Sequence, residues 1–113
     1  APYPRLMLPI SQRAVARVLA GGCAWWLALV FLRTERMAEM IGVSPSQVRA
    51  LGVRDLGNGL ALALAPDPRP HIAMRAAFDV ADSVRYGRGR PAVRAMTLGF
   101  AALGALGLLA RRP

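Results

Sequence analysis

Apolar residues form two long runs in this chain, one near each end, and both runs are almost free of charge. Residues 14–32 contain one charged side chain, Arg17, and residues 95–110 contain none. A helix over 14–32 is roughly 28 Å long, close to the hydrocarbon thickness of a bilayer. Trp25 and Trp26 lie in the middle of the first run and no small-residue cleavage pattern follows it, which argues against a cleaved signal peptide. Both runs are therefore predicted to be transmembrane helices.

A further helix is predicted over 48–65, because the sequence marks both its start and its end. Ser44, Pro45 and Gln47 fit the N-cap, first and third positions of a capping box. Pro66 cannot continue the helix, since it lacks the backbone donor and its ring clashes with the preceding turn. The intervening residues are mainly apolar, which favours a membrane-embedded helix.

Polar residues interrupt this helix and line one face of the next helix, predicted over 71–86. In the first helix Arg54 and Asp55 each lie within one turn of Asn58. In the second, polar residues recur at intervals of four, four, three and four, and they are His71, Arg75, Asp79, Asp82 and Tyr86. The short turn at 66–70 contains three prolines, so we expect the two helices to be antiparallel neighbours.

Ionisable groups within apolar helices need polar partners nearby, and these two faces provide partners for each other. We therefore predict an intramembrane charge network, and its members are Arg54, Asp55, Asn58, Arg75, Asp79 and Asp82. Two arginines and three aspartates nearly neutralise one another, as a structural network requires. Intramembrane carboxylates also act as relays, so a path for protons or ions is the alternative.

The segment 33–42 is expected to form a short helix at the membrane interface. Met37, Met40 and Ile41 would enter the lipid while the charged side chains remain in water. Gly42 is a suitable residue to end this helix. The predicted fold is therefore all-α, with four transmembrane helices in a small bundle and one interfacial helix between the first two. Residues 1–113 are expected to form a single domain.

Composition and charge agree with a membrane protein and argue against other classes. Hydrophobic residues make up 55% of the chain, and the mean hydropathy is +0.36. The net charge is +9 and every basic residue is Arg, but these arginines flank apolar runs instead of forming a continuous basic face. We therefore expect contacts with anionic lipid headgroups and not with nucleic acid. The arginines divide almost evenly between the two sides of a four-span topology, so no orientation is predicted.

Catalytic and cofactor motifs are missing from the sequence. Cys23 is the single cysteine and His71 the single histidine, so no metal site of ordinary spacing is expected. No nucleophile motif, phosphate-binding loop or metalloprotease motif occurs. We predict that the chain is not an enzyme and has no cofactor.

Small and aromatic residues on the two uncharged helices are typical of a surface for another membrane protein. Alanines recur every four residues from 16 to 28, which permits close approach of a neighbouring helix. Tryptophans normally lie at the membrane interface, so a pair in mid-helix suggests packing against protein or a bound hydrophobic molecule. The predicted interface consists of Ala20, Ala24, Trp25, Trp26, Gly99 and Gly104.

The segment Gly52-Val53-Arg54-Asp55-Leu56, with acidic residues in the following helix, resembles a group of small four-helix bacterial membrane proteins of unknown function. The resemblance implies a four-helix fold in a bacterial inner membrane. It maps an arginine–acid pair onto Arg54 and Asp55 and the next-helix acid onto Asp79 or Asp82. It implies no activity.

Three functional hypotheses follow, and the one with the least support in the sequence is an enzyme or a cofactor-binding protein; the other two have more support. The first is a non-catalytic accessory subunit that packs against a larger membrane protein complex, since the chain has very little soluble mass. The second is a small transporter or a homo-oligomer that conducts protons or ions through the charge network.

Overall fold

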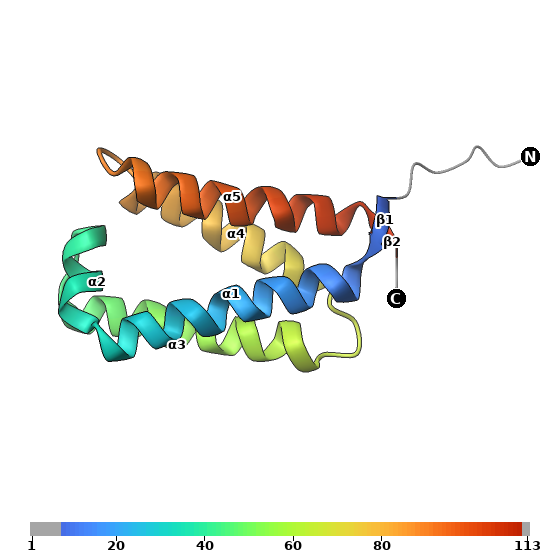
Figure 1. Ribbon diagram of the computed structural model, residues 1–113, viewed down its shortest axis with the longest axis horizontal. Helices are drawn as coiled ribbons and strands as arrows, with labels where there is room; N and C mark the ends of the chain where they lie inside the picture. The colour runs from blue at the N-terminus through green and yellow to red at the C-terminus, as the bar shows by residue number, and fades with distance from the viewer. Residues whose placement is uncertain (1–7, 112–113) are drawn as a thin grey trace, which may run out of the picture.

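The computed structural model describes residues 8–111 and confirms an all-α fold. Its helices are α1 (Gln12–Leu32), α2 (Thr34–Ile41), α3 (Pro45–Leu64), α4 (Arg69–Tyr86) and α5 (Pro91–Leu108). Two very short strands that the sequence did not predict, β1 (Leu8–Ser11) and β2 (Ala110–Arg111), pair in parallel beside the start of α1 and the end of α5 (Figure 1).

Helix starts follow the capping residues that the sequence predicts. The Oγ of Ser11 accepts a hydrogen bond from the backbone N of Ala14 at 3.0 Å. At the start of α3 the capping box is complete, because Ser44 N donates to Gln47 Oε1 at 3.0 Å and Gln47 N donates to Ser44 Oγ at 3.2 Å. Gly42 ends α2 with φ 76°, a left-handed conformation that glycine adopts without strain.

Helix α3 begins at Pro45 as its capping box predicts, whereas α4 and α5 begin a few residues earlier than predicted. Proline lies at the first or second position of α3, α4 and α5. Proline has a suitable φ for these positions, and its missing backbone donor costs nothing in a first turn. The sequence prediction left Pro70 and Pro91 outside these helices, whereas both lie inside the first turn.

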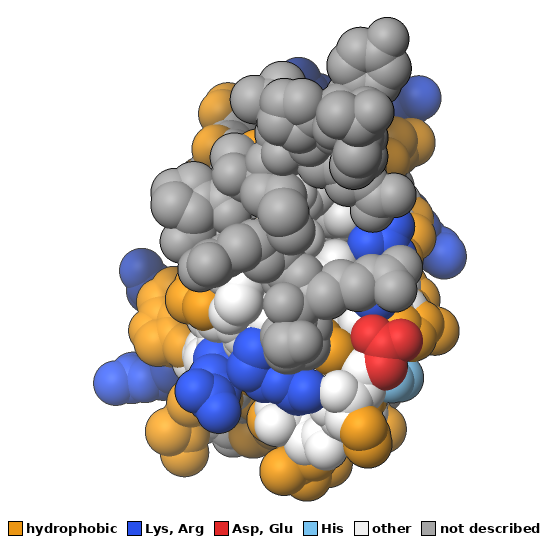
Figure 2. Space-filling view, turned by 90° about the vertical axis from the view of Figure 1, so that its right-hand side faces the viewer, with side chains coloured by type: hydrophobic (Ala, Val, Ile, Leu, Met, Phe, Trp, Pro, Cys, Tyr) orange, Lys and Arg blue, Asp and Glu red, His pale blue; other side chains and the backbone are white. Residues whose placement is uncertain are grey.

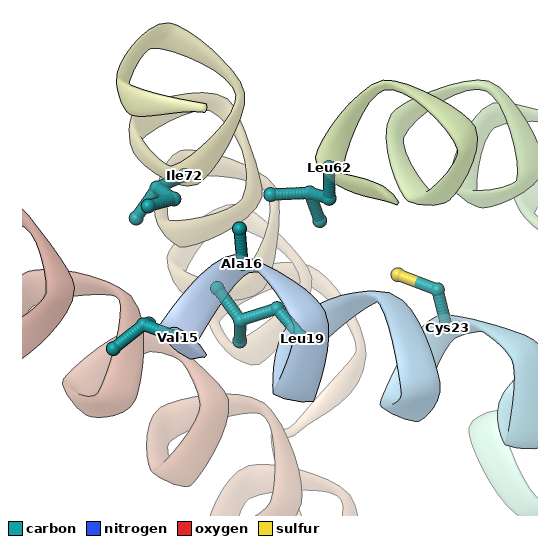
Figure 3. Close-up of a cluster of buried hydrophobic side chains, with 6 residues drawn as sticks. All are labelled: Val15, Ala16, Leu19, Cys23, Leu62 and Ile72. Carbon is teal, nitrogen blue, oxygen red and sulfur yellow. The ribbon is translucent and has the colours of Figure 1, made fainter. Parts of the chain in front are cut away.

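The long helices form two antiparallel pairs, α1 with α3 and α4 with α5 (Figure 1). The pairs meet near the chain termini and diverge toward α2. Where they meet, α1 contributes most of a buried cluster that consists of Val15, Ala16, Leu19, Cys23, Leu62 and Ile72. Figure 3 shows Leu62 of α3 and Ile72 of α4 on the side of α1 from which Ala16 projects, and Val15 directed toward α5.

Helix α2 closes the diverging end of the molecule. Met37 and Ile41 are buried in a second cluster together with Val30, Val48 and Val93, and Met40 packs against it. The prediction that the apolar face of α2 enters lipid is therefore wrong, because this face covers the ends of α1, α3 and α5 instead.

By length and composition, two helices of the described chain are able to cross a membrane, α1 with a hydropathy of 1.8 and α5 with 1.4. Both are largely exposed, since only 28% and 22% of their most apolar windows are buried. A core helix of a soluble protein would be mostly buried. The sequence prediction of four spans is not met by this criterion, because the charged residues of α3 and α4 lower their hydropathy.

Candidate functional site

The charged residues of α3 and α4 meet in the space between the two helix pairs. The sequence predicted that these two helices pack side by side along their length. Instead α3 packs mainly against α1, and α4 packs mainly against α5. The ion pairs between α3 and α4 are formed by long arginine side chains that extend from one helix to the other.

Arg54 on α3 connects the two helices through a forked ion pair. Its Nη1 donates to Asp82 Oδ1 at 3.1 Å, and its Nη2 donates to Asp82 Oδ2 at 2.6 Å. Its Nε and Nη2 also donate to Asp55 Oδ1, at 3.1 Å and 3.0 Å. All three nitrogens of this guanidinium are therefore engaged, and such two-pronged pairing fixes orientation as well as distance.

Arg75 on α4 forms the second half of the network. Its Nε donates to Asp79 Oδ2 at 3.3 Å and its Nη2 donates to Asp79 Oδ1 at 3.2 Å. Its Nη1 donates to Asp55 Oδ1 at 2.9 Å and to the Sγ of Cys23 at 3.4 Å. The side chains of Arg75, Asp55 and Asp79 are all more than nine-tenths buried.

Phe78 belongs to this site, although the sequence analysis assigned it no role there. The guanidinium carbon of Arg54 lies 4.4 Å from the centre of its ring, and that of Arg75 lies 5.6 Å away. The negative face of an aromatic ring attracts a cation, most strongly where water is absent. The signal that could have identified Phe78 from the sequence is its position, three residues after Arg75 and four residues before Asp82.

Asn58 is buried between the same helices, but it forms no hydrogen bond with the charged side chains of residues 8–111. Its Nδ2 donates to the backbone oxygen of His71 at 3.1 Å, and its Oδ1 has no hydrogen-bond partner among the described residues. Asn58 therefore ties α3 to the first turn of α4, one turn away from the ion pairs. It is a neighbour of the charge network and not a member of it.

A cavity of about 80 Å³ opens beside the ion pairs. All five charged residues of the network line one part of its wall, and Cys23 lies in the same wall. The remaining wall is mainly apolar and aromatic, and its rings are those of Trp25, Trp26, Tyr86 and Phe100. The arrangement places charged and aromatic side chains around a single small space.

The predicted partner interface is divided between the surface and the interior. Ala24 and Gly99 are exposed, and Trp25 is 57% exposed. Ala20 packs against the cluster around Leu19, and Trp26 packs against the cluster around Val30. Gly104 is buried against α4, where an added Cβ would lie 3.2 Å from the Cβ of Ala76. Ala24, Gly99 and Trp25 are therefore the exposed members of the set, whereas Ala20 and Trp26 are half-buried.

Within residues 8–111 no group of three or more His, Cys, Asp or Glu side chains is placed to hold a metal ion. Comparisons with protein-family models, curated proteins and solved structures find no match to this chain. The case for a function therefore depends on the geometry of the site and of the surface.

Proposed function

We propose that this chain is a four-span protein of a bacterial inner membrane and serves as a non-catalytic subunit of a larger membrane protein complex. The observation that carries the proposal is the inverted distribution of polarity. Asp55, Arg75 and Asp79 are buried, whereas large apolar side chains are exposed on α1, α3, α4 and α5. A soluble protein has the opposite arrangement.

The exposed faces of α3 and α4 support their inclusion among the spans. Leu56, Leu60 and Leu64 project outward from α3, and Val80 and Val84 project outward from α4. The charged residues that lower the hydropathy of these helices face inward and are paired with each other. A neutralised pair inside a bundle avoids most of the cost that an isolated charge would have in lipid. Hydropathy alone counts these residues as if each one faced lipid.

Arginines at both ends of the bundle fit contacts with anionic headgroups. Arg17 and Arg69 are exposed near the termini, and Arg33, Arg36 and Arg88 are exposed at the opposite end. Figure 2 shows basic side chains at the terminal end, with hydrophobic side chains forming much of the outline of the molecule. Basic residues at the edge of an apolar belt interact favourably with acidic lipids.

A structural role for the network is supported by its pairing. Arg54 and Arg75 each contact two carboxylates. Both carboxylate oxygens of Asp79, and both of Asp82, accept a hydrogen bond from an arginine. Breaking one buried pair strands the other charge, so such a network fixes the relative position of the helices. The subunit would then offer a rigid outer surface to its partner.

The surface proposed for the partner lies on the outer faces of α1 and α5. Ala24 and Gly99 are exposed, and the space above Gly99 is open. Small residues let a neighbouring backbone approach closely, and close packing is a main source of helix association in lipid. Trp25 adds a large exposed ring to the face of α1.

The test is purification of tagged protein in a mild detergent, followed by size-exclusion chromatography and mass spectrometry. Wild-type protein should elute with one or more larger membrane proteins in fixed stoichiometry. Gly99→Leu and Ala24→Leu should reduce this association, while Gly57→Leu, an exposed glycine of α3 with open space around it, should not. A homo-oligomer without other proteins would favour the transporter alternative and would contradict the subunit proposal.

A further inference from the structure

The cavity beside the ion pairs has a charge that the protein does not balance. Arg54 and Asp82 form one forked pair, and Arg75 and Asp79 form another. These two pairs are each neutral. Asp55 is the third carboxylate of the site, so the site as a whole carries one excess negative charge when its groups are ionised.

The excess charge has a specific location on Asp55. Every hydrogen bond that this carboxylate accepts from residues 8–111 ends on Oδ1, with donors from Arg54 and Arg75. The second oxygen, Oδ2, has no protein donor in the described chain. The Asp55 side chain is only 6% exposed and lines the cavity. Oδ2 therefore keeps its capacity to accept a hydrogen bond or to pair with a cation, and a ligand in the cavity is one way to use it.

The remaining wall determines which ligand fits. A bare metal cation requires several oxygen ligands, and the cavity offers one carboxylate oxygen that is free of protein donors. The rings of Trp25, Trp26, Tyr86 and Phe100 instead suit a cation with an apolar surface. Aromatic rings grouped around a carboxylate are well suited to alkylated ammonium groups, because the ring faces attract charge while tolerating methyl groups.

We propose that this cavity binds the ammonium head of an apolar organic cation, with Asp55 Oδ2 as the charge partner. The volume of about 80 Å³ is suited to a small head group and not to a large molecule. The remainder of the ligand would extend through the open side of the cavity. This inference rests on the cavity and its charge alone, and it holds whether or not the chain is a subunit of a larger complex.

The protein contains its own reporter for this binding. Its only two tryptophans are Trp25 and Trp26, and both line the cavity. The probe is benzyltrimethylammonium, added to purified full-length protein in a non-ionic detergent while tryptophan fluorescence is recorded. The matched control is neopentylbenzene, which has the same shape but carries carbon in place of the charged nitrogen. We expect saturable fluorescence changes with the cation and at least about tenfold weaker binding of the neutral compound.

Two variants locate the site. Asp55→Asn keeps the shape of the side chain and removes the excess charge, so it should weaken binding of the cation at least about tenfold and leave the neutral compound unaffected. Phe100→Leu should weaken binding of the cation without altering the ion pairs. Retention of the fold is checked by circular dichroism.

Equal binding of the two probes by wild-type protein would overturn the proposal, and so would the absence of saturable binding of the cation. Full affinity in a folded Asp55→Asn variant would also overturn it. If Asp55→Asn does not fold, the comparison of the two probes on the wild-type protein and on Phe100→Leu still decides the question.

Discussion

The guanidinium of Arg54 meets the carboxylate of Asp82 through two parallel hydrogen bonds, at 3.1 Å and 2.6 Å, and so joins α3 to α4. These helices otherwise contact each other only lightly. Together with the bond from Arg75 to Asp55, this pair connects the α1–α3 pair of helices to the α4–α5 pair through side chains.

Arg54→Leu should lower the stability and the accumulation of the protein. Removing one member of a fully buried ion pair costs about 3–5 kcal/mol, and the lower end applies here because the Arg54 side chain is 27% exposed. The second change Asp82→Leu should restore much of the loss, since it removes the stranded partner. Asp79→Leu in the Arg54→Leu background should not, because Asp79 is paired with Arg75. Membrane-fraction levels and thermal unfolding in detergent measure these effects. Equal rescue by the two aspartate changes would mean that only net charge matters.

The position of α3 in the bilayer is tested by cysteine accessibility in a Cys23→Ser background. Leu60 is 52% exposed on the outer face of α3, whereas Asp67 lies in the exposed turn after this helix. If α3 spans the membrane, Leu60→Cys should resist a membrane-impermeant maleimide in sealed or opened vesicles. Asp67→Cys should react once its side of the membrane is accessible. Comparable reaction rates at both sites in opened vesicles would place α3 outside the bilayer.

The end of α2, the start of α3 and the charged faces were predictable because they depend on local sequence. Ser44, Gln47 and Gly42 act through hydrogen bonds or backbone conformation within one turn, so the sequence contains the whole signal. Likewise, helical spacing alone places Arg75, Asp79 and Asp82 on one face.

The sequence did not predict equally well whether each helix face contacts lipid, a partner or the rest of the protein. Lipid tails are as apolar as leucine, so an apolar pattern does not tell a surface that faces lipid from one that faces protein. For this reason Met37 and Ile41 were assigned to lipid although they are buried, and Gly104 was assigned to a partner although it is buried against α4. Phe78 was missed because an aromatic ring reads as apolar even when its face contacts two guanidinium groups.

Arg13 should stabilise the turn between α3 and α4. Its Nη1 donates to the backbone oxygen of Ala65 at 2.7 Å, and its Nη2 donates to that of Pro66 at 2.6 Å. Carbonyl groups at the end of a helix lack partners within the helix, and a positive charge there is favourable. Arg13→Gln should therefore destabilise the protein by about 1–2 kcal/mol, less than two fully buried bonds would give. Arg17→Gln, at an exposed position of the same helix, is the control and should have little effect on thermal unfolding in detergent.

The contact between α1 and α3 should be sensitive to an added methyl group at Gly59 but not at Gly57. A Cβ added at Gly59 would lie 2.9 Å from the Cβ of Cys23, closer than real Cβ contacts occur, whereas a Cβ at Gly57 would meet nothing within 4 Å. Gly59→Ala should therefore separate the two helices and destabilise the protein by about 1–3 kcal/mol, as overpacking does. Gly57→Ala should stabilise it by up to about 1 kcal/mol, because alanine loses less backbone entropy in a helix. Both variants add one methyl group to the same helix. Helix propensity alone therefore predicts that they stabilise the protein equally. Opposite shifts of the unfolding temperature would identify close packing at Cys23 as the cause, and equal shifts would show that α1 does not approach α3 at this position.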